Sequence, residues 1–280
     1  MTTPRLLAIH DMCSFGRCSL TAAIPTLSAM GIQVCPFPTA IFSNNMTYKN
    51  IDFVDFSAHM TKFMDIWQQN GYEYDAIYSG FLANASQIAI VEDAIERFSK
   101  EGTLVVADTA MADDGVLYPV FDATIVQAMR HLISKAQVIT PNYTEACLLL
   151  DIPFEDRIPT MRELTKWCQG LSEMGPEKVV ITSVPAANNE IKNVSYDSHT
   201  YSYDECTTPR IAFSTCGTGD LFTSVLTGFL LKGLALHEAI KKSTSFMAYC
   251  IKQTQEAETD PREGIQIEPC LPELINMCIG

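Results

Sequence analysis

The sequence contains no apolar run that approaches the roughly 18 residues of a membrane span. Its first ten residues, 1–10, lack the apolar stretch of an export signal. The ten cysteines include no Cys-x-x-Cys pair and no His/Cys cluster with zinc-ligand spacing. These absences predict a cytoplasmic protein that makes no membrane contact and keeps its thiols reduced.

Basic residues are also scarce. The 280 residues include 19 Lys and Arg against 33 Asp and Glu, which gives a formal net charge of −14. Because binding of a phosphate backbone needs a basic face, this balance argues against nucleic acid as a partner. Small phosphorylated ligands stay possible, since they need only a local positive field or a bridging cation. The 47% apolar content excludes a disordered chain.

Short β-rich runs alternate with stretches of helical periodicity along the whole chain. This alternation predicts one α/β domain over 1–280, with a mainly parallel sheet covered by helices on both faces. The expected strands are 6–9, 32–35, 76–78, 104–107, 138–139 and 179–181, with a hairpin over 191–203. The expected helices are 20–30, 56–67, 88–98, 125–133, 144–150, 161–174, 219–231 and 236–251.

The segment Ser214–Phe222 carries the strongest chemical signal, because a Gly-Thr-Gly-Asp sequence runs into an apolar helix. No Walker-type loop occurs, and the third glycine of a dinucleotide fingerprint is missing. Glycines allow close backbone approach, and the free N–H groups of a helix start bind anions. Asp220 beside them could accept a proton from an attacking hydroxyl, as phosphoryl transfer requires. The alternative that Asp220 only caps the helix stays open.

Two further polar segments follow predicted strands, where parallel sheets bind ligands. Thr140-Pro-Asn142 leads to Glu145, which either begins a helix or lies near a hydrated Mg²⁺. The acidic loop, residues 108–118, places Asp108 directly after an apolar strand. Such acids are either solvated turn formers or ligands of a cation and phosphates.

These segments occur in an order that resembles the ribokinase-like superfamily. Other stretches are similar to its pyridoxal/pyridoxamine kinase branch: Ala8–Thr21, Leu27–Gly31, Phe42–Asn44, Ser79–Leu82, Ile139–Ala146, Thr259–Arg262 and Glu268-Pro269. The resemblance implies a ribokinase-like three-layer sandwich and a homodimer. It also implies Mg²⁺- and ATP-dependent phosphorylation of the hydroxymethyl group of pyridoxal, pyridoxamine or pyridoxine.

The resemblance also implies roles for individual residues. Asp220 takes the position of the general base, and the anion-hole positions fall on Gly217, Thr218 and Gly219. Asp108 and Glu145 match the positions that organise Mg²⁺. The ATP-binding positions fall on Asp108, Asp113, Tyr118, Thr140, Asn142, Thr182 and Ser183. The substrate-pocket positions fall on Asp11, Cys18, Ser43, Met46 and Phe81.

The sequence departs from this pattern in two loops. Thr109, Ala110 and Ala112 replace the Pro, Val and Gly of the usual acidic loop, and Asn45-Met46 replaces a His-Thr pair in the pocket. Two alternatives therefore stay open. One is a hydroxymethylpyrimidine or hydroxymethylpyrimidine-phosphate kinase, and the other is a catalytically weak, vitamer-binding homologue.

Overall fold

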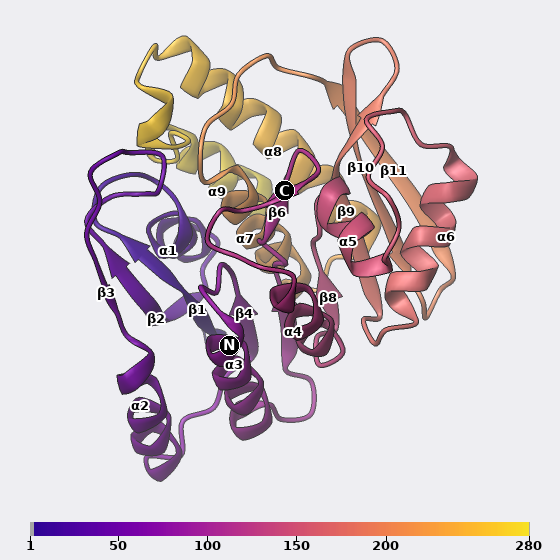
Figure 1. The fold of residues 1–280 in the computed structure, drawn as a ribbon. Coiled ribbons are helices and arrows are strands. Elements are labelled where there is room, and N and C mark those ends of the chain that lie inside the picture. The colour runs from indigo at the N-terminus through magenta and orange to yellow at the C-terminus, as the bar shows by residue number, and fades with distance from the viewer. Residues whose placement is uncertain (1–2, 280) are drawn as a thin grey trace.

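A computed structural model describes residues 3–279 of the chain, and one large sheet runs through it (Figure 1). Its strand order is β11-β10-β9-β8-β5-β4-β1-β2-β3. The six strands from β9 to β2 in this order are parallel, whereas β3, β10 and β11 run antiparallel to their neighbours. The strands of this sheet are β1 (Arg5–Cys13), β2 (Gln33–Phe42), β3 (Phe53–Asp55), β4 (Ala76–Ser79), β5 (Leu104–Ala107), β8 (Val138–Ile139), β9 (Lys178–Ala186), β10 (Glu190–Asp197) and β11 (Ser202–Pro209). A separate small hairpin joins β6 (Ala112–Asp113) to β7 (Val116–Leu117).

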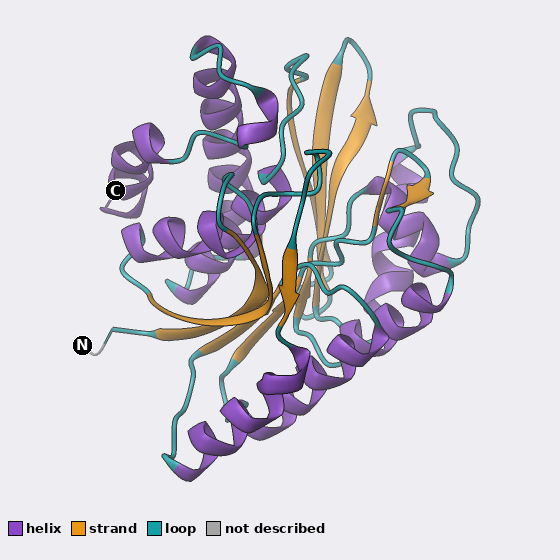
Figure 2. Ribbon diagram, turned by 60° about the vertical axis from the view of Figure 1, so that its left-hand side comes forward, coloured by secondary structure: helices purple, strands orange, loops and turns teal. Residues whose placement is uncertain are grey.

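Helices cover the two faces of the sheet in two layers (Figure 2). One apolar cluster holds α2 (Ser57–Gln69), α3 (Ala85–Phe98), α4 (Thr124–Ile133), α5 (Tyr143–Leu150) and α6 (Met161–Ser172) against the first face. A second cluster holds α1 (Ser19–Ala29), α7 (Thr218–Leu231), α8 (Leu236–Glu256) and α9 (Leu271–Ile279) against the other. Two short 3-10 helices, Pro261–Glu263 and Glu268–Cys270, precede α9. The predicted three-layer sandwich is therefore confirmed.

Strand β1 shows why the short apolar runs form a central sheet. Leu7 and Ile9 lie in the first cluster, and Leu6 and Ala8 lie in the second. Successive side chains of a strand point to opposite faces, so a strand buried on both sides reads as a continuous apolar run. None of the helices within residues 3–279 combines the length and the apolar character needed to cross a bilayer.

Several elements differ from the expectation. Strand β2 continues past the predicted end at residue 35 and includes Pro36 and Pro38. Proline is normally a signal against a strand, so the sequence does not predict this extension. The three residues of the edge strand β3 are all exposed, so no apolar alternation marks it. The hairpin predicted over 191–203 is present, but its strands extend further at both ends, over Glu190–Asp197 and Ser202–Pro209. Helix α9 was not predicted.

The topology brings the polar ends of neighbouring strands to one edge. Strands β1, β4, β5 and β8 are parallel neighbours, and each carries its polar residues at its carboxyl end. These residues are His10-Asp11 on β1, Ser79-Gly80 on β4, Asp108 after β5 and Thr140 after β8. The first turn of α7 approaches the same edge, because Asp220 contacts His10.

Candidate active site

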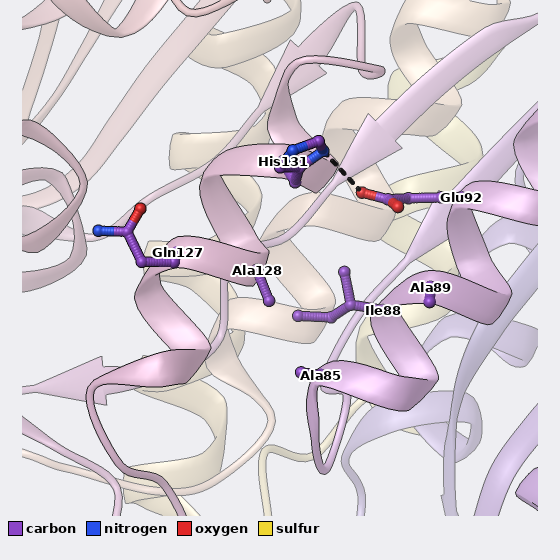
Figure 3. Close-up of a pocket in the computed structure, with 7 residues that line it drawn as sticks. All are labelled: Ala85, Ile88, Ala89, Glu92, Gln127, Ala128 and His131. Carbon is purple, nitrogen blue, oxygen red and sulfur yellow. Dashed lines mark ion pairs between the residues drawn. The ribbon is translucent and has the colours of Figure 1, made fainter.

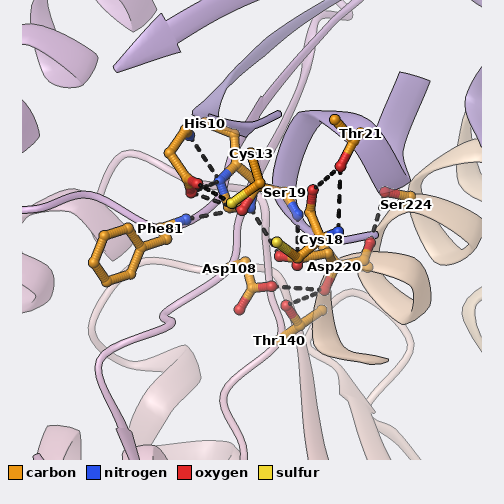
Figure 4. Close-up of polar contacts among 12 residues, drawn as sticks. His10, Cys13, Cys18, Ser19, Thr21, Phe81, Asp108, Thr140, Asp220 and Ser224 are labelled. Atoms are coloured by element: carbon orange, nitrogen blue, oxygen red, sulfur yellow. Dashed lines mark hydrogen bonds and ion pairs between the residues drawn. The ribbon is translucent and has the colours of Figure 1, made fainter. Parts of the chain in front are cut away.

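Asp220 lies in the first turn of α7, and its carboxylate does not cap that helix. Oδ1 accepts from His10 Nε2 at 2.8 Å, and Oδ2 accepts from the backbone N–H of Ser19 at 2.7 Å (Figure 4). The N-cap of α7 is Gly217, with φ +83°. Both carboxylate oxygens are thus directed by residues of β1 and α1, which leaves the N–H groups of this helix start for another acceptor.

Gly217 allows the chain to turn closely against the residues that precede α1. A Cβ at this position would lie 2.0 Å from the carbonyl oxygen of Arg17. Thr218 and Gly219 begin α7, and a Cβ on Gly219 would lie 4.0 Å from Asp108 Oδ2. The predicted anion-binding turn therefore lies beside both Asp220 and the end of β5.

Asp108 and Thr140 are joined to α7 through one hydroxyl group. Thr223 Oγ1 donates to Asp108 Oδ2 at 3.2 Å and lies 2.9 Å from Thr140 Oγ1. Asp108 is buried, and burial together with the nearby charge of Asp220 raises the pKa of its carboxyl to about 7. Two predicted site residues, Asp108 and Thr140, are thus joined to α7, the helix that carries Asp220.

Glu145 fastens the acidic loop to the start of α5. Its carboxylate accepts from the backbone of Asn142, from Thr109 Oγ1 and from the backbone of Met111, each at 2.9 Å. Asn142 completes a capping box by accepting from the backbone N–H of Glu145, also at 2.9 Å. Burial and the charge of Asp108 raise the pKa of Glu145 to about 8.

The remaining residues predicted to bind ATP make no hydrogen bond or ion pair with Asp220 in the described part of the chain. Asp113 lies in β6, where its carboxylate accepts from the backbone of Asp114. Tyr118 lies 6.4 Å from Phe121 between ring centroids. Thr182 pairs with Asn142 in an isolated parallel bridge, and the exposed Ser183 has φ +58°.

The predicted substrate residues divide into buried and exposed groups. Asp11 is buried and accepts from Ser19 Oγ at 2.7 Å, and Cys18 is the buried N-cap of α1. Phe81 lies 5.5 Å from the ring of Phe121. Ser43 and Met46 are exposed on the loop after β2, with 49% of Met46 accessible. Within residues 3–279, no hydrogen bond or ion pair joins these two to the Asp220 cluster.

Asn45, one of the departures in the pocket loop, is a structural residue. Its side chain is buried, donates to the carbonyl of Arg262 at 2.7 Å and accepts from the backbone of Thr47 at 3.0 Å. We expect Asn45→Ala to lower the free energy of unfolding by about 1–3 kcal/mol, because it removes a buried side chain together with both of these hydrogen bonds. The exposed Asn70 provides the matched control, Asn70→Ala. Equal urea midpoints for the two variants would contradict this role.

Four contacting residues were not assigned a role from the sequence: His10, Ser19, Gly80 and Thr223. His10 gave the clearest signal, because a histidine at the end of an apolar strand lies where ligands bind. Its partner Asp220 is 210 residues away, so periodicity cannot reveal the contact. The Ser19 donor is a backbone N–H at a residue with φ +54°, which leaves no trace in the sequence.

A groove of about 360 Å³ between α3 and α4 lies elsewhere on the molecule (Figure 3). It is lined by Ala85, Ile88, Ala89, Glu92, Gln127, Ala128 and His131. None of the predicted site residues lines it, and its helices cover the face opposite to α7.

The three-layer sandwich, with an acidic side chain and a glycine turn at the start of α7, defines a ribokinase-like α/β kinase fold. Residues 14–263 match the phosphomethylpyrimidine kinase family, and the chain belongs to that family.

Named relatives agree with this membership. A candidate phosphomethylpyrimidine kinase of Bacteroides thetaiotaomicron, solved with pyridoxal, is 42% identical with a TM-score of 0.94 over 98% of this chain and 96% of its own. The pyridoxal kinase of Lactobacillus plantarum is 27% identical with a TM-score of 0.90 over 99% and 98%. The pyridoxal kinase of Sus scrofa is 28% identical over 96% of this chain and 89% of its own length.

Proposed function

We propose that this protein transfers the γ-phosphoryl group of ATP to the hydroxymethyl group of pyridoxal, pyridoxamine or pyridoxine. The observation that carries the proposal is the Asp220 carboxylate, held beside the N–H groups of the α7 start, in a chain whose relatives include named pyridoxal kinases. An acceptor for a hydroxyl proton next to an anion site is what phosphoryl transfer to an alcohol needs.

Each group of site residues has a part in this reaction. Asp220 takes the proton of the hydroxymethyl group, and the N–H groups of Gly217, Thr218 and Gly219 hold the transferring phosphoryl group. The nucleotide binds to residues that follow β5 and β8, that lie within β9, and that belong to the acidic loop: Asp108, Thr140, Asn142, Thr182, Ser183, Asp113 and Tyr118. The ring of the substrate lies against residues from β1, α1 and two loops: Asp11, Cys18, Ser43, Met46 and Phe81.

Mg²⁺ is the metal that this site would use. Mg²⁺ prefers hard oxygen ligands and retains several waters and phosphate oxygens around one or two carboxylates. Asp108 supplies a buried carboxylate, and Glu145 supplies a second one whose oxygens already accept hydrogen bonds from the acidic loop. In the described residues no group of three or more His, Cys, Asp or Glu has metal-site geometry. The two carboxylates of Asp108 and Glu145 fit a hydrated ion carried by the nucleotide, which would neutralise phosphate charge.

We expect activity to vanish in excess EDTA and to return with added Mg²⁺. Glu145→Gln should raise the Mg²⁺ concentration needed for half-maximal velocity, because a glutamine cannot ionise when a cation binds beside it. The measurement is initial velocity against free Mg²⁺ at saturating ATP, with the exposed Glu256→Gln as control. Full activity in EDTA would contradict the metal requirement.

An ADP-release assay tests the function. Wild-type protein is supplied with ATP and with pyridoxal, pyridoxamine, pyridoxine, hydroxymethylpyrimidine or hydroxymethylpyrimidine phosphate. The highest kcat/KM should be with a pyridoxal-type vitamer. A preference for either pyrimidine would support the second candidate function, which is also consistent with the family membership. Tight vitamer binding without ADP release would indicate a binding homologue instead.

We further propose that the chain works as one kinase domain over residues 1–280, in the cytoplasm and as a homodimer, without a nucleic-acid partner. Support comes from the resemblance of its motifs and from its net charge of −14. Light scattering of the purified protein measures the mass directly, and 62 kDa is expected for a dimer of 31.0 kDa chains (2 × 31.0).

A further inference from the structure

His10 lies between two carboxylates at the carboxyl end of β1 (Figure 4). Its Nε2 is 2.8 Å from Asp220 Oδ1, and its Nδ1 is 3.0 Å from Asp11 Oδ1. The backbone N–H groups of Asp11 and Phe81 also approach the ring, at 3.0 Å from Nδ1 and 3.4 Å from Nε2. A neutral imidazole would donate to one carboxylate and accept at its other nitrogen, whereas an imidazolium donates to both carboxylates. Although burial opposes the charged form, Asp220 and Asp11 raise the pKa of His10 to about 10.

Neighbouring residues pack closely around the imidazole ring of His10 and restrict its position. A Cβ on Gly80 would lie 1.9 Å from its Cδ2 atom, so the ring occupies the space that a side chain there would fill. The ring of Tyr78 meets it edge-on at 6.2 Å between centroids. Asp11 is held in turn by Ser19 Oγ, and β2 contains one extra residue opposite His10–Met12. This irregularity accompanies the contact between the successive side chains of His10 and Asp11.

Within residues 3–279, His10 is the cationic side chain that contacts Asp220. Other titratable groups also face the pair, from β1, β4, the end of β5, the acidic loop, the start of α1 and the turn before α7: Asp11, Tyr78, Asp108, Tyr118, Cys18 and Cys216. Burial alone would raise the pKa of Asp220, but the charge and hydrogen bond of His10 hold it below its usual range. A carboxylate can serve as a base only when it is ionised, and the bound phosphates of ATP would oppose that state.

We propose that His10 is a positioning residue for Asp220: its imidazolium keeps the carboxylate ionised and aimed at the substrate hydroxyl. This inference rests on the proposed kinase function. In the transfer step the hydroxymethyl oxygen bonds to the γ-phosphorus, and the bond from that phosphorus to the bridging oxygen of ADP breaks. The bond's electron pair leaves with ADP. The hydroxyl proton moves to Asp220, while His10 retains both of its protons.

Two variants test the role of the charge. His10→Gln keeps an N–H donor but removes the charge, and Gly80→Ala displaces the ring while leaving the histidine in the chain. The acidic limb of kcat/KM against pH should move upward by about one to three pH units in both, the usual effect of an adjacent opposite charge. KM for ATP should change little, and the loss should be recovered at high pH. The exposed His59→Gln is the control and should leave the profile unchanged.

A second measurement does not depend on turnover. In ¹⁵N-labelled wild-type protein without substrates at pH 8, both ring nitrogens of His10 should carry protons, with the signal assigned by its absence in His10→Gln. A neutral ring at pH 8 would overturn the proposal. So would an acidic limb that stays in place while kcat falls equally at every pH, because a merely structural residue behaves in that way. If wild type shows no kinase activity, the proposed function fails, and the ring protonation still decides the charge of His10.

Discussion

Asp220→Asn is expected to lower kcat by about 10²–10⁴-fold, the usual loss when a general base is removed. Asparagine has nearly the shape of aspartate, and its amide oxygen can still accept from one of the two donors that hold the carboxylate, His10 Nε2 on Oδ1 or the Ser19 N–H on Oδ2. It cannot accept the proton of the attacking hydroxyl. The nucleotide should still bind, because the N–H groups at the start of α7 belong to the backbone.

The comparison needs kcat, KM for ATP and a nucleotide-binding isotherm for wild type and variant. Asp204→Asn is the matched control, since Asp204 is exposed on β11. The control should retain wild-type kcat. A folded Asp220→Asn protein that also retains wild-type kcat would remove Asp220 from the role of base.

Gly217→Ala is expected to lower kcat/KM for ATP by about 10²–10³-fold, comparable to the loss of an anion-hole donor. The backbone of Gly217 has φ +83°, and a methyl group there would lie 2.0 Å from the carbonyl oxygen of Arg17. Because that contact is with backbone, the turn itself must move. The N–H groups of Thr218 and Gly219 would then point away from the phosphoryl group.

Gly233→Ala is the control that separates the effect of the steric clash with Arg17 from the effect of a strained backbone. Gly233 follows the C-terminal end of α7 with φ +84°, and nothing lies within 4 Å of a Cβ built on it. Both variants should lose stability by about 1–2 kcal/mol from the left-handed backbone. Only Gly217→Ala should also lose nucleotide turnover. If the two variants have equal kcat/KM, the turn before α7 does not form the anion site.

The layered fold could be predicted because its signals are local. The strands β4 and β5 are short, apolar and almost wholly buried, so their runs stand out between amphipathic helices. The motifs at the strand ends could be placed at one edge because parallel strands share the direction of their carboxyl ends. Asp108 and Thr140 thus lie against α7, the helix that carries Asp220, as the topology required.

The support of these residues could not be predicted in the same way. The contact of His10 with Asp220 joins β1 to α7 and depends on an irregularity in the pairing of β1 with β2. The capping box of Asn142 and Glu145 also reaches the backbone of the acidic loop, which a helix-start pattern does not reveal. The structural role of Asn45 could not be predicted either, because its hydrogen-bond partner Arg262 is 217 residues away in the sequence.

The central claim is that Asp220 accepts the proton when a vitamer is phosphorylated. Mass spectrometry of reactions with Mg²⁺, ATP and pyridoxal tests it most directly, with wild type and Asp220→Asn compared at equal enzyme concentration. Wild type should form pyridoxal 5′-phosphate and ADP in equal amounts, and the variant should form about 10²–10⁴-fold less of both in the same time. Equal yields from the two proteins, or ADP without phosphorylated pyridoxal from wild type, would contradict the account.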